Sequence, residues 1–445
     1  MDLKEKKILV MGASGKSGRS AALCYAKMGA TVLLADADAK ELPDLAGVVG
    51  IQDMRPRDDA GLLDSSVDLI VTAPGVPLSL DIFSSARERG IPVFGENDLG
   101  AHLISTSWNP PPFVCAVTGT DGKSTTTALI DHMARSVGIS SVACGNFGTP
   151  LSSLVFDPPV RMLSLECSSF QLEPARFLRA HVAMILNLSQ DHMDRYATLD
   201  DYLHAKLNVT MNQTAEDLFI APKWILDRST TPARKMALES LQYVRDEIWF
   251  SGKAVARLAD YSLPGAHNRI NLNFALAALE NASERLGISV SAESIRSAIA
   301  SFRGLPHRME SVVTVRGIEF VNDSKATTVQ AVCSGLTAFA GRSVALLCGG
   351  YDKGLDYSEL AKFEGVVLLP FGEAGPKIAR DTGAARVYAT LEEALRAGAD
   401  LCKSQGQGVV YLGPACASYD AYNSYEERGE HFRSLALGLA KEWNA

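Results

Sequence analysis

Short apolar runs alternate with stretches of helical spacing along nearly the whole chain, and this alternation limits the fold more than any other feature. Between the apolar runs of the first third, Ser20–Met28 and Asp81–Arg89 carry apolar residues at helical spacing. The runs themselves are Ile8–Met11, Thr31–Ala35, Leu69–Thr72 and Pro92–Phe94. Because strands that alternate with helices tend to pair in parallel, the pattern predicts a parallel sheet with helices on both faces.

Two breaks divide the pattern into three series. Ser105–Pro112 ends in a run of prolines, which cannot continue a helix or a central strand. Gly304–Arg308 is a second turn, which follows the helical patterns Arg269–Leu286 and Ala292–Phe302. The strands expected after the first break are Phe113–Thr118, Met162–Leu165 and Val182–Asn187, and those after the second are Glu310–Val315, Ile318–Asn322, Val344–Leu347, Gly365–Pro370 and Val409–Leu412.

The sequence therefore predicts an α/β protein of three tandem domains, comprising residues 1–107, 108–305 and 306–445. A chain of 445 residues is too long for one ordinary core and fits two to three domains. The first and third domains are expected to be Rossmann-like, and the central domain to contain a mostly parallel sheet.

Charge and cysteine usage narrow the class of protein. The formal net charge of −8 argues against a nucleic-acid partner, which would need a basic face. No apolar run is long enough to span a bilayer or to form a signal peptide, so we expect a cytoplasmic protein without membrane insertion. The eight cysteines never occur at CxxC spacing, and Cys115 and Cys348 lie within apolar runs. They are expected to be reduced and buried, without a zinc site.

Two glycine loops share one spacing. Gly12–Ser17 and Gly119–Ser124 both have the form Gly-x-x-Gly-Lys-Ser, follow an apolar strand and open a helix. Backbone N–H groups and the helix dipole at such a helix start favour an anion, and the lysine adds a positive charge. Both loops are two residues shorter between their glycines than the G-x-x-x-x-G-K-[ST] loop.

The first loop has more than one interpretation. It fits a tight strand-to-helix turn without any ligand, and it also fits a phosphate site. Gly12, Gly15 and Gly18 match a loose dinucleotide fingerprint, with Asp36 ending the next strand at about the expected spacing of ~20 residues.

The second loop is the stronger candidate because a run of hydroxyl residues follows its lysine. Lys123 precedes Ser124, Thr125 and two further threonines. Ser124 is placed to coordinate a Mg²⁺ that bridges two phosphates, as the hydroxyl does in P-loop enzymes. This loop predicts that the central domain is a P-loop-type ATPase domain.

Two strand ends add candidate metal ligands, because a magnesium–ATP site needs oxygen ligands beyond the loop. Glu166 ends an apolar strand at the edge where open α/β sheets bind ligands, although a single carboxylate there is as often a capping residue. His192 lies in an acidic loop that leaves the same edge, which favours a functional role. Lys206, within the helical pattern Tyr202–Val209, is interpreted from its spacing alone as a surface lysine.

Two other classes of protein explain only part of these residues. An NAD-dependent dehydrogenase would use Gly12–Gly18 and Asp36, but it would leave Gly119–Ser124 without a role. A P-loop kinase or NTPase switch would use the second loop, but it would leave the Asp323-Ser324-Lys325 segment unexplained.

Nine motifs taken in order along the whole chain resemble the Mur ligase family. Each is weak or moderate singly, whereas the ordered set is specific. They are Thr118–Thr127, Gly145–Pro150, Glu166–Glu173, Asp191–Tyr196, His267–Asn271, Gly304–Arg308, Asn322–Thr327, Gly349–Gly354 and Pro414–Ser418. The amino-acid sequences of Glu166–Glu173 and Pro414–Ser418 are most similar to the same segments in the family members that add D-glutamate.

The resemblance implies an ATP site that two Mg²⁺ ions complete. Ser124 and Glu166 would hold one Mg²⁺, and His192 would hold the second together with a carbamate formed on Lys206. Lys123, His192, Lys206 and Lys325 are the residues that it implies for catalysis. The ATP contacts would be Gly119, Thr120, Asp121, Gly122, Lys123, Ser124, Thr125, Asn268, Asn271, Arg308 and Asp323.

The resemblance also implies two substrate sites. The UDP part of the acceptor would contact Gly15, Lys16, Ser17, Asp36, Gly75 and Asn146. The incoming amino acid would contact Thr327, Lys353, Ser418 and Tyr425, beside Lys325. In the ATP loop, Asp121 stands where the family more often has asparagine. In the first domain, Lys16 and Ala73, the latter where serine is common, both depart from the family, so the acceptor contacts depart more than the ATP site does.

The implied activity is ATP-dependent ligation of D-glutamate to UDP-N-acetylmuramoyl-L-alanine through an acyl phosphate, in peptidoglycan precursor synthesis. The implied partners are these small molecules alone, and the protein is expected to be a monomer. A similar ligase that uses L-glutamate, another Mur ligase and a folylpolyglutamate synthase remain the alternatives.

Overall fold

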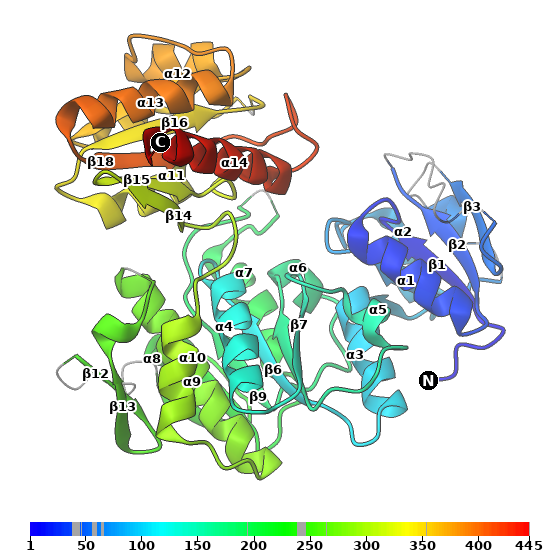
Figure 1. The fold of residues 1–445 in the computed structure, drawn as a ribbon. Helices are drawn as coiled ribbons and strands as arrows, with labels where there is room; N and C mark the ends of the chain where they lie inside the picture. The colour runs from blue at the N-terminus through cyan, green and yellow to red at the C-terminus, as the bar shows by residue number, and fades with distance from the viewer. Residues whose placement is uncertain are drawn as a thin grey trace. The chain divides into compact units, whose positions relative to one another are not determined.

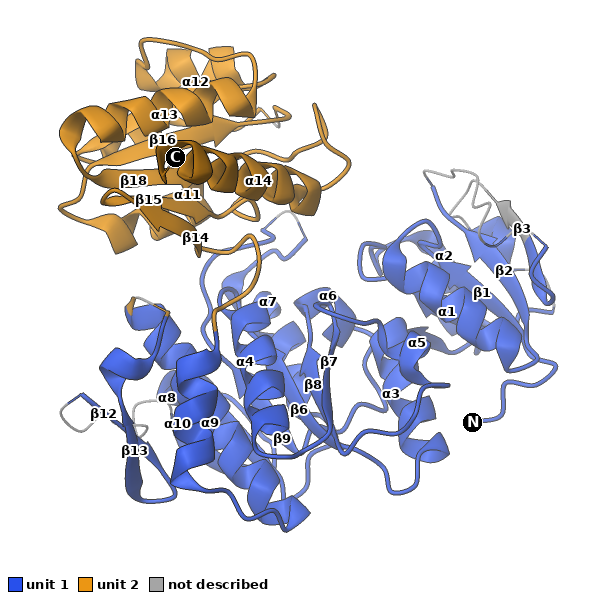
Figure 2. Ribbon diagram, in the orientation of Figure 1, with its two compact units in different colours: residues 1–262, 266–302 blue, residues 263–265, 303–445 orange. Residues whose placement is uncertain are grey.

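Three mostly parallel sheets and one hairpin contain the strands of the computed structural model. The model describes residues 1–37, 45, 47–55, 60–63, 66–193, 195–237, 246–263, 265–352 and 354–444. The chain divides into two compact units, Met1–Ser262 with Ala266–Phe302 and Leu263–Gly265 with Arg303–Ala445 (Figure 2). None of the described helices is long and apolar enough to cross a membrane.

The first sheet has the strand order β3-β2-β1-β4-β5, and its described strand pairs are parallel. Ile8 and Val10 pack into one apolar layer and Leu9 and Met11 into the other, because successive side chains of a strand point to opposite faces. The strands are β1 (Lys7–Met11), β2 (Thr31–Ala35), β3 (Ile51–Arg55), β4 (Leu69–Thr72) and β5 (Val93–Gly95). The helices are α1 (Lys16–Lys27), α2 (Asp81–Glu88) and α3 (Glu96–Ser107), with a 3-10 turn at Ala60–Leu62 (Figure 1).

The second sheet, in the same unit, has the order β11-β10-β9-β6-β8-β7 and is parallel. Its strands are β6 (Phe113–Thr118), β7 (Ser141–Gly145), β8 (Met162–Glu166), β9 (Val182–Ile185), β10 (Leu218–Ala221) and β11 (Arg234–Ala237). A separate antiparallel hairpin consists of β12 (Glu247–Phe250) and β13 (Lys253–Arg257). The helices are α4 (Lys123–Ser136), α5 (Leu151–Leu154), α6 (Ser169–Leu172), α7 (Leu199–Leu207), α8 (Lys223–Leu226), α9 (Ala266–Leu286) and α10 (Ala292–Ser301), with 3-10 turns at Asn208–Thr210 and Leu258–Asp260.

The position of β6 determines where a ligand can bind in the second sheet. This strand is fully buried and pairs with β8 on one side and β9 on the other. Since the three strands are parallel, the loops that follow them leave the same edge of the sheet. These loops begin at Gly119, Cys167 and Leu186, so the edge has the geometry at which open α/β sheets bind ligands.

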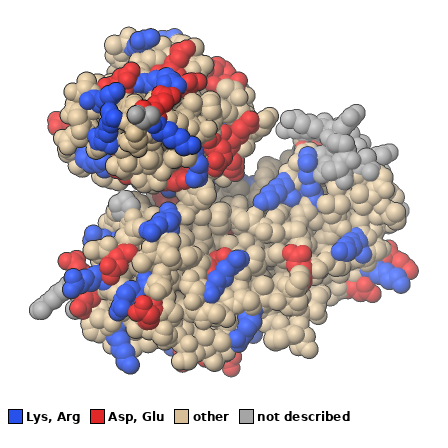
Figure 3. Space-filling view, viewed as in Figure 1, with Lys and Arg blue, Asp and Glu red and all other residues tan. Residues whose placement is uncertain are grey.

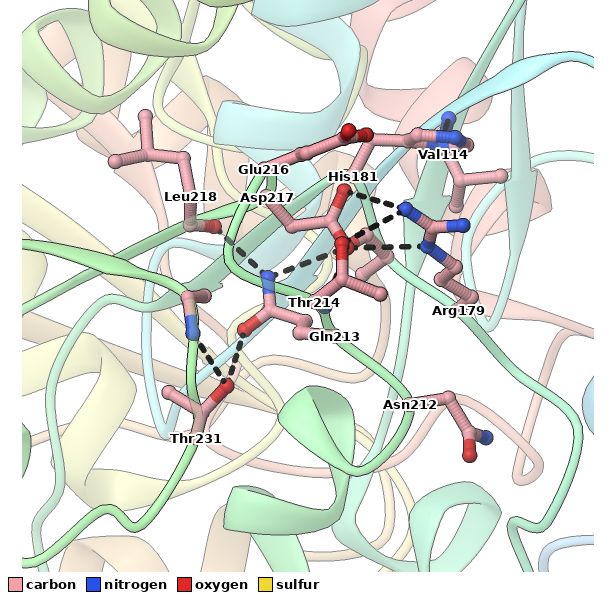
Figure 4. Close-up of polar contacts among 12 residues, drawn as sticks. Val114, Arg179, His181, Asn212, Gln213, Thr214, Glu216, Asp217, Leu218 and Thr231 are labelled. Carbon is pink, nitrogen blue, oxygen red and sulfur yellow. Dashed lines mark hydrogen bonds and ion pairs between the residues drawn. The ribbon is translucent and has the colours of Figure 1, made fainter.

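The opposite edge of this sheet is held by a buried carboxylate, shown in Figure 4. Asp217 precedes β10 and accepts hydrogen bonds from Arg179 Nε (3.0 Å), Thr214 N (2.8 Å) and Arg285 Nη1 (3.1 Å). Nearby, His181 Nδ1 accepts from Val114 N at 3.0 Å, and burial lowers the pKa of His181 to about 4. A neutral histidine and a fully paired carboxylate are what a structural cluster requires.

The second unit is built on a sheet of order β14-β15-β18-β16-β17, in which only the described pair β14–β15 is antiparallel. Leu395 and Phe432 lie in the apolar layer on one face, and Val332 and Ile378 in the layer on the other. The strands are β14 (Glu310–Val315), β15 (Ile318–Asn322), β16 (Val344–Gly349), β17 (Val366–Phe371) and β18 (Gly408–Leu412). The helices are α11 (Val329–Leu336), α12 (Gly375–Thr382), α13 (Leu391–Gln405) and α14 (Tyr425–Asn444), with 3-10 turns at Thr337–Phe339 and Ser358–Lys362.

The predicted α/β class with a mostly parallel sheet is confirmed. Several predicted elements have other bounds: Pro92–Phe94 is Val93–Gly95, and Val182–Asn187 ends at Ile185, because the next residues turn into the loop. The three-domain division stays a prediction, since the first compact unit contains the sheets of both the first and the central predicted domain. The eight cysteines are free, and seven of them are buried, with Cys333 half-buried.

On the face seen in Figure 3, Lys and Arg side chains of the described residues are interspersed with Asp and Glu rather than forming one continuous basic surface. The expected absence of a nucleic-acid partner stays a prediction.

Candidate active site

The loop between β6 and α4 has the backbone of a tight anion-binding turn. Gly119 and Gly122 have φ values of +147° and +79°, which a residue with a side chain rarely adopts. A Cβ at Gly122 would also lie 2.6 Å from Asn271 Oδ1 on α9. Lys123 begins α4, and its Nζ donates to Gly119 O (3.0 Å) and Thr120 O (2.6 Å). The lysine charge therefore lies over the loop at the positive end of the helix.

Asn187 ties this loop to the end of β9, a role that the sequence analysis missed. Its Oδ1 accepts from Thr120 N (3.1 Å) and Asp121 N (2.9 Å), and its Nδ2 donates to Asp121 O (3.1 Å). These two backbone N–H groups are used within the loop, so an anion would be bound by those further along, at the start of α4. The signal in the sequence was an asparagine at the end of an apolar run, two residues after the strand that pairs with the one before the glycine loop.

Lys206 is buried against the same loop, and the interpretation of it as a surface lysine was wrong. It is 1% exposed, its Nζ donates to Gly119 O at 2.7 Å, and the ring centroid of Tyr202 lies 4.3 Å away. Burial, reinforced by the nearby charge of Lys123, lowers the pKa of Lys206 to about 7. The helical spacing could not reveal this, because the contact is with a loop 87 residues earlier in the chain.

Glu166 ends β8 beside the loop and is 1% exposed. Its Oε1 accepts from Asn146 Nδ2 at 2.6 Å, whereas its Oε2 is buried without a hydrogen-bond partner. Asn146, which was predicted to contact the acceptor, thus orients the carboxylate in this structure. A buried carboxylate oxygen without a donor is costly unless a cation or a donor arrives, which fits a metal ligand.

His192 is more exposed to solvent than the other residues predicted to bind metal. Its side chain is 43% exposed, its φ is +55°, and its Nε2 lies 3.3 Å from Asp191 Oδ2. The ring of Phe170 packs against it with centroids 4.7 Å apart. Among the described residues no three His, Cys, Asp or Glu side chains are grouped closely enough to hold a metal, so a site here would need Ser124 and a modified Lys206 as well.

The two asparagines predicted to lie near the adenine are both on α9 and are buried. Asn271 Nδ2 donates to Asn268 Oδ1 at 3.3 Å, and Asn271 is the residue nearest to the position of a Cβ at Gly122. Ser124, the second residue of α4, is 5% exposed. The structure therefore brings both asparagines and the loop together.

The first glycine loop borders a separate pocket of about 440 Å³. Five of the six residues predicted to bind the UDP part line it, namely Gly15, Lys16, Ser17, Asp36 and Gly75. Asp36 Oδ2 accepts from Ser14 N at 2.9 Å, and Lys16 Nζ donates to Gly148 O at 2.6 Å. Asn146, the sixth residue, is bonded to Glu166 as described above.

The second unit holds the remaining predicted residues. Burial raises the pKa of Asp323 to about 6, although Tyr411 OH (2.8 Å) and Met309 N (3.2 Å) both donate to its carboxylate. Lys325 Nζ lies 4.0 Å from the ring centroid of Tyr425. Ser418 is buried, Arg308 and Thr327 are partly exposed, and Lys353 lies outside the described residues.

A parallel α/β core with a glycine–lysine loop at the carboxyl end of a central strand defines the class of P-loop-type nucleotide-binding enzymes. Residues 117–279 match the model of the Mur ligase middle domain, and the chain belongs to the Mur ligase family. Its relatives include the UDP-N-acetylmuramoylalanine--D-glutamate ligase of Pelotomaculum thermopropionicum, 34% identical with 99% of each chain covered. That of Anaeromyxobacter dehalogenans is 37% identical, also with 99% of each chain covered.

Solved structures share the fold at low sequence identity. UDP-N-acetylmuramate-alanine ligase MurC from Thermotoga maritima has a TM-score of 0.54 at 18% identity, with 97% of this chain and 99% of that chain covered. A bifunctional folylpolyglutamate synthase/dihydrofolate synthase from Yersinia pestis, solved with AMPPNP and a Mn ion, has a TM-score of 0.56 at 16% identity, with 77% and 93% covered.

Proposed function

We propose that this chain is an ATP-dependent ligase that joins D-glutamate to UDP-N-acetylmuramoyl-L-alanine in the synthesis of a peptidoglycan precursor. Full-length relatives that carry this activity in their names support it. The observation that carries the proposal is the convergence of Lys123, Glu166 and buried Lys206 at one edge of the second sheet. A dehydrogenase would have no use for this set.

The reaction proceeds in two steps. A carboxylate oxygen of the acceptor attacks the γ-phosphorus of ATP, the bond from that phosphorus to the bridging oxygen breaks, and ADP leaves. The amine of glutamate then attacks the carbonyl carbon of the acyl phosphate, loses a proton, and inorganic phosphate departs. Lys123 offsets charge on the phosphates in the first step, and Lys325 stabilises the tetrahedral oxyanion in the second.

The residues at the loop fit Mg²⁺. Glu166 has a buried carboxylate oxygen without a protein donor, and oxygen ligands of this kind are those that Mg²⁺ prefers. Ser124 and Glu166 would hold one ion, and His192 and Lys206 would contribute to a second. Bound Mg²⁺ would neutralise triphosphate charge and so let an anionic carboxylate approach.

Lys206 would serve as a metal ligand after carbamylation by CO₂. The modification requires the neutral amine, and a pKa of about 7 makes that form abundant at neutral pH. Lys206→Ala should abolish turnover, and high bicarbonate should not restore it. Near-normal activity in this variant would remove the carbamate hypothesis.

The proposed substrate contacts are those that the resemblance to the Mur ligases implies. The UDP part would occupy the pocket lined by Gly15, Lys16, Ser17, Asp36 and Gly75, with Asn146 turning between the acceptor and Glu166. Asn268 and Asn271 would flank the adenine, and Arg308 and Asp323 would reach the nucleotide. Lys325, Thr327, Lys353, Ser418 and Tyr425 would receive the amino acid. We propose a cytoplasmic monomer.

The activity can be tested by phosphate release from ATP with UDP-N-acetylmuramoyl-L-alanine. Reactions with D-glutamate, L-glutamate, meso-diaminopimelate and no amino acid should show strong release with D-glutamate alone. Activity only with L-glutamate would show that the enzyme is the similar ligase that uses L-glutamate. Activity only with a folate or with another Mur acceptor would contradict it.

A further inference from the structure

Arg428 is a completely buried cation in the second unit, with 0% of its surface exposed. A guanidinium has five N–H donors, and here all five are used. Nε donates to Ser324 Oγ (3.0 Å), Nη1 to Ala417 O (3.0 Å) and Gly349 O (3.4 Å), and Nη2 to Ser324 O (2.9 Å) and Cys416 O (3.1 Å). None of these acceptors is a carboxylate.

The acceptors belong to three loops at one edge of the sheet. Ser324 follows β15, Gly349 ends β16, and Cys416 follows β18, and these three parallel strands are neighbours in the sheet. Their carboxyl ends therefore meet above Arg428, which reaches them from α14. This is the edge at which open α/β sheets bind ligands.

The bonds of Arg428 fix the backbone beside Lys325 and Ser418, two residues of the proposed amino-acid site. Ser324 precedes Lys325, and Cys416 and Ala417 precede Ser418. Ser324 Oγ also donates to Tyr425 O at 2.8 Å. One side chain thus positions the loops from which the lysine, the serine and the tyrosine project.

Gly350 lets the loops close around the guanidinium. A Cβ at this position would lie 2.8 Å from Arg428 Nη1 and 2.2 Å from Ala417 O. Its φ is +136°, which also disfavours any residue with a side chain. The glycine and the buried arginine are therefore two parts of one arrangement.

The positive charge of Arg428 is not cancelled by its bonds. Carbonyl and hydroxyl oxygens satisfy the donors, but they carry no net charge to oppose a buried cation. Burial lowers the pKa of Arg428 to about 10, and Asp420, the nearby acid, accepts from Glu373 N (3.4 Å) rather than from the guanidinium. A substrate with two carboxylates would bring the missing negative charge to this edge.

We propose that Arg428 is a positioning residue for the incoming amino acid. It holds the loops after β15, β16 and β18 in fixed positions relative to one another, and it gives this edge of the sheet a positive potential that favours a dicarboxylate. The inference rests on the proposed function, because it assigns the substrate of that activity to this edge of the second unit.

The test compares Arg428→Gln and Arg428→Lys with Arg433→Gln as the matched control. Arg433 is on the same helix, but it is partly exposed and ion-paired with Glu310 at 2.6 Å. In Arg428→Gln the KM for D-glutamate should rise at least tenfold, while the KM values for ATP and for the acceptor stay within twofold. Arg428→Lys keeps the charge and should show a smaller rise in that KM, and the control should show none.

Two further readouts separate positioning from a loss of structure. Hydroxylamine can replace the amino acid and trap the acyl phosphate as a hydroxamate, and its formation should be unchanged in both Arg428 variants. Glutarate should inhibit the unaltered enzyme more strongly than butyrate, and this difference should shrink in Arg428→Gln.

The outcomes that overturn the proposal differ from those that overturn the activity. An unaltered enzyme that does not use glutamate contradicts the proposed function itself. If it does use glutamate, an unchanged KM for glutamate in Arg428→Gln overturns the role of Arg428. Equal losses of ligation and of hydroxamate formation in both variants overturn it too, since they indicate a merely structural role.

Discussion

The two glycine loops have the same spacing and lysine, yet they differ in their surroundings. Gly15, before α1, has an ordinary φ of −79°, and Lys16 reaches away from its loop to Gly148 O. Gly122, before α4, is left-handed with φ of +79°, and Lys123 folds back over its own loop. The first loop borders an open pocket, whereas the second contacts a buried lysine and lies beside a buried glutamate.

The difference between the loops comes from what the rest of the fold places against them. Asn187 and Lys206 come from elements far along the chain, and both contact the second loop. Such partners pre-organise a loop for a dense negative charge, as a triphosphate requires. In the first loop, Ser14 N donates to Asp36 Oδ2, and this loop borders the wider pocket.

Replacing the lysine of the second loop should reduce turnover far more than replacing Lys16 of the first loop. Lys123→Met should lower turnover by roughly 10³-fold, because a charge aimed at the transferred phosphate is lost. The measurement is phosphate release at saturating substrates. A loss below about tenfold would show that the second loop does not carry the phosphate chemistry.

Replacing the buried Lys206 should abolish activity but stabilise the protein. The folded-state pKa is about 7 and the ordinary value is 10.5, so between these pH values the unfolded chain binds more protons and the stability of the unaltered protein rises with pH. Lys206→Met removes this burial cost and should add roughly 2–4 kcal/mol at pH 7, with a smaller gain near pH 10. Denaturant unfolding in CO₂-free buffer measures both values; lower stability of the variant at pH 7 would argue against a costly buried amine.

The glycines provide a matched pair for backbone strain. Gly122→Ala should cost about 2–3 kcal/mol, because alanine disfavours a left-handed conformation and its Cβ meets Asn271 Oδ1. Gly15→Ala should change stability by less than about 0.5 kcal/mol, since the nearest atom to its Cβ is 3.5 Å away. Equal effects on the midpoint of chemical denaturation would contradict the difference between the loops.

Removing the amide that ties the second loop should have a moderate effect. Asn187→Ala loses three hydrogen bonds of a partly exposed side chain and should cost about 1–2 kcal/mol, with the KM for ATP rising roughly tenfold. In the first loop, Asp36→Ala should raise only the KM for the acceptor. Steady-state titrations of both substrates distinguish the two; a changed ATP affinity in Asp36→Ala would be the unexpected result.

Replacing the first lysine should affect the acceptor alone and leave turnover at saturating substrates close to that of the unaltered enzyme. Lys16→Met should raise the KM for the acceptor by roughly tenfold, equivalent to one charge-assisted hydrogen bond, and leave the KM for ATP unchanged. Binding of UDP alone, measured by calorimetry, should weaken by a similar factor. Unaltered UDP binding would mean that Lys16 only bonds the backbone at Gly148.

The sequence by itself determined the α/β class, the parallel sheets, the glycine loop before Lys123 and the strand end at Glu166, because hydrophobic periodicity and glycine loops are local properties. The ordered motifs also indicated the family, which the relatives confirmed. Periodicity could not find edge strands such as β11, whose residues are partly or fully exposed and carry little apolar signal.

Only the tertiary structure decided which polar side chains are buried. Lys206 looked like a surface lysine, and Arg428 gave no sign in the sequence, yet each is bonded to a loop far away in the chain. Burial depends on which distant segments pack together, and burial is what lowers the pKa of a lysine or surrounds an arginine with neutral hydrogen-bond acceptors. The same Gly-x-x-Gly-Lys-Ser spacing therefore gave two different loops, and their neighbours in the fold made the difference.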